Sequence, residues 1–176
     1  MDSGVCDHPR RSDLGELTLN TDILIIYLND HLAGSVAAVQ LVEHLAQASR
    51  GSERQNFFTT LRAEIVEDQE VLKRLLSQIG GKESKVRKAA AWLTEKIGEA
   101  KLNLDDTGNG QLRLLEALET LGLGIQGKLG LWLALEAAAA PELRELDLPR
   151  LERRARDQLE RVEAQRLQVA RAAFGA

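Results

Sequence analysis

The sequence predicts an all-α fold: an up-down four-helix bundle with a short crossover helix between two antiparallel hairpins. Its 176 residues are rich in Leu, Ala, Glu, Arg and Lys, with 3 Pro and 3% aromatics, which favours helix over strand. Hydrophobic residues make up 44% and charged residues 28%, a globular rather than a disordered composition. Four long stretches repeat apolar residues at helical spacing.

The first hairpin follows a polar N-terminal segment. Residues 1–18 lack periodicity and are expected to form a flexible arm, and residues 19–176 to form the domain. A long helix is predicted from Asn20 to about Arg50, where glycine follows. Ser52 and Gln55 then have the spacing of a capping box. The second helix is expected to end at the Gly-Gly pair 80–81.

The second half of the chain repeats this arrangement after a longer connection. A short helix is predicted over 84–101 and a loop over 104–110. Long helices are predicted over 111–140 and 147–174, the latter with Pro149 in its first turn. Because the loops within each pair are short, each pair is expected to be an antiparallel hairpin, with the middle connection crossing the bundle.

Charge and cysteine content exclude several classes of protein. Lys and Arg total 23 against 27 Asp and Glu, giving a net charge of −4 and a pI near 5.5, which disfavours nucleic-acid binding. A single cysteine fits a reducing compartment, and residues 1–18 lack the apolar core of a secretory signal. No stretch of about 18 residues lacks charge, so we expect a cytoplasmic protein without a membrane span.

Polar residues interrupt the apolar stripes near the middle of the predicted bundle. Asp68 breaks the stripe of the second helix, with Glu64 one turn before it. Two interpretations compete: a small metal or ligand site, and a hydrogen-bonded charge network that fixes helix register. We favour the network. Its predicted members, beside the two carboxylates, are Ser35, Glu119 and Arg166, and the candidate metal ligands are Glu64, Asp68 and His31.

The chain resembles the ferritin-like superfamily, and most of all its uncharacterised bacterial members. The likeness covers residues 20–174 and is carried by YLNDHLAGSVAAVQLVEHL with RAEIVEDQEVLKRLLSQIGG, and by LEALETLGLGIQGKLGLWLAL with RARDQLERVEAQRLQVARAAF. Metal-binding members of that superfamily use a Glu from each of two helices and Glu-x-x-His from each of the other two.

The metal ligands that the resemblance implies are missing from this sequence. His8, His31 and His44 are its three histidines, and Val, Leu and Leu stand three residues before them. Ser35 stands where the resemblance implies an inward Glu, and Arg166 would place a cation on the inner stripe. We therefore expect no ferroxidase or di-iron oxidase activity and no cofactor; the alternative is iron or manganese at an atypical carboxylate/His site.

The fourth predicted helix, 111–140, carries unusually many small residues on its outward side. Glycine within a helix costs about 1 kcal/mol relative to alanine, so a run of glycines suggests close packing against another backbone. A second subunit is favoured over the crossover helix, since Leu123 and Leu131 are also expected to face outward. The predicted contact positions are Thr120, Gly127, Gly130, Ala134 and Ala138.

These observations predict a non-enzymatic bundle protein with a structural or interaction role. We expect a bacterial, stress-associated homodimer that contacts an unidentified protein partner through its helical surfaces. A metal-binding protein is the alternative function. A third hypothesis is a ligand pocket beside Tyr27, Trp132 and Gln126.

Overall fold

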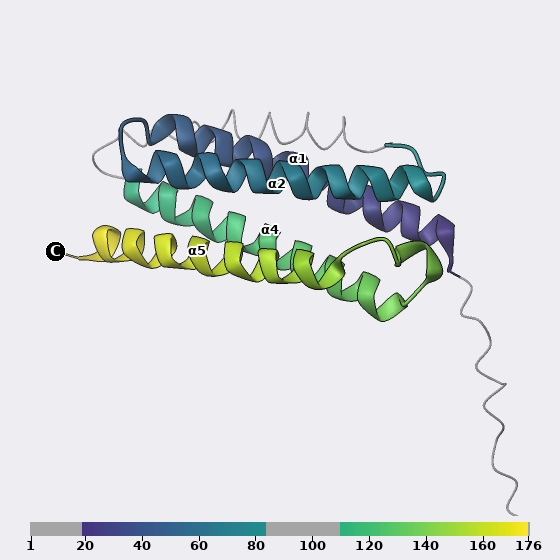
Figure 1. The fold of residues 1–176 in the computed structure, drawn as a ribbon. Coiled ribbons are helices and arrows are strands. Elements are labelled where there is room, and N and C mark those ends of the chain that lie inside the picture. The colour runs from purple at the N-terminus through teal and green to yellow at the C-terminus, as the bar shows by residue number, and fades with distance from the viewer. Residues whose placement is uncertain (1–18, 84–109, 176) are drawn as a thin grey trace, which may run out of the picture.

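A computed structural model describes residues 19–83 and 110–175, and within them the fold is entirely helical (Figure 1). The long helices are α1 (Thr21–Ala48), α2 (Glu53–Gln78), α4 (Gly110–Ala138) and α5 (Leu148–Phe174), and a 3-10 helix spans Pro141–Leu143. This confirms the all-α fold and the four-helix bundle. The predicted arm 1–18, helix 84–101 and loop 104–109 lie outside the described residues.

Polar side chains begin two of the helices where the sequence indicates. The Asn20 side chain accepts a hydrogen bond of 3.1 Å from the Ile23 N–H at the start of α1. Asp147 accepts one of 3.1 Å from the Arg150 N–H, and Pro149 occupies the first turn of α5. Each cap satisfies a backbone donor that has no partner within the helix.

The capping box predicted at the start of α2 is wrong. The Ser52 hydroxyl donates 2.7 Å backwards to the Ser49 carbonyl and makes no cap bond to α2. Gln55 Oε1 instead accepts a 2.9 Å hydrogen bond from the N–H of Gly51, one residue earlier than the box requires. The left-handed turn at Gly51, with φ of +78°, brings that N–H within reach of the glutamine.

The four long helices form two antiparallel hairpins that are joined by one long connection. α1 and α2 form one antiparallel hairpin, and α4 and α5 form the other (Figure 1). α2 and α4 run in the same direction, so the two points joined by residues 79–109 lie at opposite ends of the bundle.

Two apolar cores fill the two ends of the bundle. One is built from the first halves of α1 and α5 and the second halves of α2 and α4, and it includes Trp132. The other uses the opposite halves and includes Phe58. Both of these side chains are essentially fully buried. Between the cores, at mid-height, the interior is polar, as the sequence predicts.

Candidate functional site

The centre of the polar layer is Asp68 of α2, which is 2% exposed. Its Oδ2 lies 2.6 Å from the Lys128 Nζ of α4, and its Oδ1 accepts from the Arg154 guanidinium of α5. Arg154 also bonds Glu67 at 2.7 Å. Three helices therefore meet at one buried carboxylate, which is compensated by two cations.

The network continues along α5 through Gln158, whose side chain is completely buried. Its carbonyl accepts from Lys128, and its amide donates 3.0 Å to Glu64 Oε2. Glu64 also accepts 2.5 Å from Arg161, whose Nε lies 2.9 Å from Asp157. The layer is thus a continuous chain of charges and amides joining α2, α4 and α5.

Burial and pairing act on Lys128 in opposite directions. Removal from water lowers the pKa of its ammonium group, and the adjacent Asp68 carboxylate opposes that change. A buried charge is tolerated when it is both paired and hydrogen-bonded, and Lys128 has both kinds of contact. The network joins α2, α4 and α5 through these contacts, an arrangement that can fix the register of the three helices.

The structure separates the residues that the sequence assigns to one network. Ser35 accepts a 3.0 Å hydrogen bond from Gln69 on the α1–α2 side. Arg166 bonds Glu163 at 2.7 Å and reaches Glu119 at only 3.5 Å, on the rim of the α4–α5 pair. The pairing of Glu119 with Arg166 is found, but its half-exposed position lies outside the buried layer, because Arg166 is long enough to extend to the surface.

The candidate metal ligands do not form a metal centre in this geometry. Glu64 and Asp68 both accept from cationic side chains, and His31 packs edge-on against Tyr27 with a ring separation of 4.6 Å. Within residues 19–83 and 110–175, no group of three or more His, Cys, Asp or Glu side chains is placed to hold a metal ion. The donor set of a di-iron protein does not fit this interior, whose carboxylates already have Lys128, Arg154 and Arg161 as counter-charges.

The half-buried His31 is expected to make the stability of the fold depend on pH. Burial lowers the pKa of its imidazole, with a smaller opposing effect of Asp30. The unfolded chain therefore binds a proton at higher pH than the folded chain does, so the free energy of unfolding should fall as pH decreases through about 6.5. We expect urea unfolding midpoints to decrease between about pH 7.5 and 5.5, and to decrease less in His31→Gln. Equal decreases in both proteins would contradict this assignment.

A cavity of about 420 Å³ lies between α1, α2 and α4, and Asp68 and Lys128 of the buried network are part of its lining. Its wall includes Tyr27, His31 and three glycines, at 34, 124 and 127. Tyr27 therefore lines a cavity, as the third hypothesis expects, but Trp132 and Gln126 do not line it. Trp132 is instead 1% exposed within a core.

The outward side of α4 is uncharged over four turns. Four of the predicted contact positions, Thr120, Gly127, Gly130 and Ala134, are exposed, and Ala138 is half-buried. Leu123 lies among them and is 76% exposed, but the outward position predicted for Leu131 is wrong. Leu131 is completely buried because it packs into the core that contains Trp132.

The cationic and amide members of the buried network were not identified from the sequence. Lys128 is the only charged residue between Thr120 and Glu136, which is a signal that could have marked it. Gln158 precedes Leu159, an apolar residue predicted to face the core. In the structure α5 is rotated so that Gln158 is the buried one of the two. Arg154 lies in a run of alternating charges in which nothing distinguishes it.

Comparisons with known proteins give no neighbour for this architecture. No protein-family model matches the chain, and the searches of curated proteins and of solved structures found no significant match. Among the described helices, α1 alone is apolar and long enough to cross a membrane, with a mean hydropathy of 1.2 over its most apolar window. Core helices and signal sequences meet the same criteria, so the absence of a membrane span stays a prediction.

Proposed function

We propose that this chain is a non-enzymatic, ferritin-like bundle protein that acts as a homodimer in the bacterial cytoplasm. Two features support the scaffold. α2 and α4 run in the same direction and are joined by one long connection, which is the connectivity of ferritin-like bundles. The position at mid-height where such a bundle would hold metal is filled by the Asp68–Lys128–Arg154 ion pairs.

The observation that carries the dimer is the uncharged outer side of α4. Between Thr120 and Glu136 the only charge is Lys128, and its ammonium group is turned inward to Asp68. Charged residues make up 28% of the whole chain, so an uncharged surface of this length is unusual for it. Two copies can meet through this surface without repulsion between like charges. A second copy is therefore the occupant that this face fits best.

Small residues add a geometric reason for self-association. A Cβ added at Gly127 or Gly130 would meet no atom within 4 Å, so no described neighbour within the chain requires these glycines. Glycines on an exposed helix face allow the backbone of a second helix to approach closely. Leu123, 76% exposed, is the apolar anchor of the proposed contact.

The proposal predicts a dimer that single substitutions on α4 convert to a monomer. Sedimentation equilibrium of the native chain should give twice the chain mass of 19.4 kDa. Leu123→Glu and Gly127→Glu should each give the monomer with unchanged helical circular dichroism, because each places a charge in the contact. Leu167→Glu, at a site 42% exposed on α5, is the matched control and should remain dimeric. A monomeric native chain, or a dimeric Leu123→Glu variant, would contradict the proposal.

A further inference from the structure

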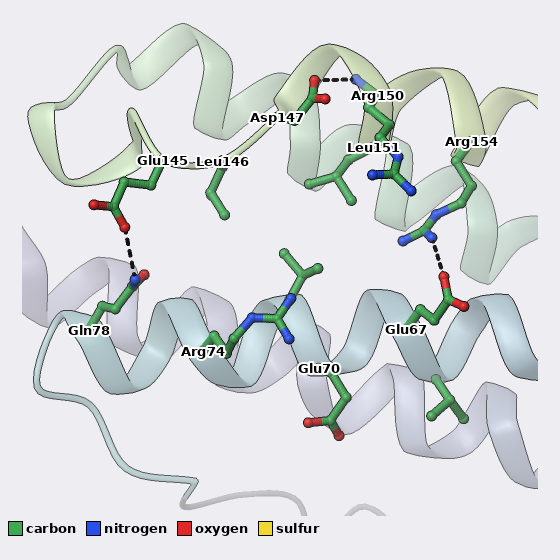
Figure 2. A pocket seen from close by; sticks show the side chains of 12 residues that line it. Glu67, Glu70, Arg74, Gln78, Glu145, Leu146, Asp147, Arg150, Leu151 and Arg154 are labelled. Atoms are coloured by element: carbon green, nitrogen blue, oxygen red, sulfur yellow. Dashed lines mark hydrogen bonds and ion pairs between the residues drawn. The ribbon is translucent and has the colours of Figure 1, made fainter.

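A second cavity lies on another side of the molecule from the α4 face. It has a volume of about 620 Å³ and is bounded by α2, the turn at 145–147 and the first turns of α5 (Figure 2). This volume lies within the range of small-molecule sites in proteins, about 300–1,000 Å³. The cavity is independent of the proposed dimer contact, so a ligand here would be a separate property of the protein.

The polar part of this cavity is lined by three arginines and four carboxylates, and two of the arginines are unpaired within the described residues. Arg74 from α2 and Arg150 from α5 project into the space between the helices (Figure 2). Within the described residues, neither guanidinium makes a hydrogen bond or an ion pair, whereas the neighbouring Arg154 bonds Glu67 and Asp68. Two guanidinium groups are thus available at opposite walls of one cavity.

The carboxylates around the cavity are each engaged elsewhere. Glu67 pairs with Arg154 at 2.7 Å, and Glu70, whose side chain points away from Arg74 and Arg150 in Figure 2, pairs with Lys73 at 2.8 Å. Asp147 caps α5, and Glu145 accepts a 3.3 Å hydrogen bond from Gln78. None of them bonds either free guanidinium, so an anion from outside the chain is the complementary partner.

The remaining wall of the cavity is apolar. It is contributed by Val66 and Val71 of α2, by Leu146 of the turn and by the buried Leu151 of α5. An inorganic anion would use the guanidinium groups and leave these side chains in contact with water. A ligand with an anionic head and an apolar body would use both.

From this combination we propose that the α2–α5 cavity binds a carboxylate that carries a short aliphatic chain. The carboxylate would bond the guanidinium groups of Arg74 and Arg150, since planar guanidinium and carboxylate groups match in a bidentate geometry. The aliphatic chain would lie against Leu146, Leu151 and the two valines. Each buried methylene group should then raise the affinity about fourfold.

Isothermal titration calorimetry of the full chain with sodium octanoate at fixed ionic strength tests this proposal. Saturable binding of one octanoate per chain is expected, with much weaker binding of acetate and of the uncharged octanol. Arg74→Gln and Arg150→Gln should each weaken octanoate binding roughly tenfold, the effect of losing one charge-assisted hydrogen bond. Arg171→Gln removes the same charge at the far end of α5 and should bind octanoate like the native chain.

Three results would overturn the proposal. Absence of octanoate binding, or equal loss in Arg171→Gln, would show that the two arginines form no specific site. Equal affinity for octanol would show that the head group is not recognised. Inorganic phosphate binding as tightly as octanoate would show an anion site to which the apolar wall contributes nothing. Thermal unfolding of each variant shows whether the fold is retained.

Discussion

Replacing Asp68 with alanine is expected to lower the free energy of unfolding by about 3–5 kcal/mol. The carboxylate is 3% exposed, and its removal leaves Lys128 and Arg154, 13% and 18% exposed, without their shared counter-charge. Breaking a buried ion pair costs more free energy than the pair itself contributes, because it leaves desolvated charges without their counter-charge. Urea unfolding followed by circular dichroism measures the change.

Glu67→Ala is the matched control for Asp68→Ala. Glu67 precedes Asp68 in the chain and also bonds Arg154, but its side chain is 66% exposed. Water can replace this contact, so the loss should stay below about 1 kcal/mol. Similar losses in the two variants would show that burial at position 68 has no particular importance, and the network would then contribute no more than a surface ion pair.

Trp132→Ala is expected to lower the free energy of unfolding by about 3–5 kcal/mol, the usual cost of truncating a large buried aromatic residue. Trp132 is 1% exposed and belongs to the core that also contains Leu28, Leu75 and Leu151. Its removal leaves a void that helices of a packed bundle can only partly close. The measurement is again urea unfolding, with the near-ultraviolet spectrum reporting the packing that remains.

Trp132→Phe separates packing from hydrogen bonding at the same site. The indole Nε1 is buried and has no hydrogen-bond partner in the described structure. Phenylalanine therefore removes no polar contact there and retains most of the apolar contact, so less than half of the alanine effect is expected. A phenylalanine variant as unstable as the alanine variant would contradict this and show that the indole N–H makes a stabilising hydrogen bond.

The helices could be predicted from the sequence because their signals are local. Asn20 and Asp147 cap helices where the sequence indicates, and the stripe through Phe58, Leu61 and Ile65 is buried as its spacing predicts. The failure at Ser52 is also local, since the spacing of a capping box does not show where the Gly51 turn directs each donor.

The composition of the polar layer could not be predicted as well, because it depends on how helices rotate against each other. Asp68 was identified, since a carboxylate in an apolar stripe is visible in one helix alone. Its partners Lys128 and Arg154 lie 60 and 86 residues away and become neighbours only when the helices pack. The same applies to Arg74 and Arg150, which face one cavity from two helices.

We propose that ion pairs, and not a metal, occupy the middle of this four-helix bundle. Elemental mass spectrometry of native protein purified without chelators or an affinity tag tests it most directly. Iron, manganese and zinc are each expected far below one equivalent per chain. One or two equivalents of any of them, lost in Asp68→Ala protein that remains folded, would contradict this proposal and assign the polar layer to metal binding.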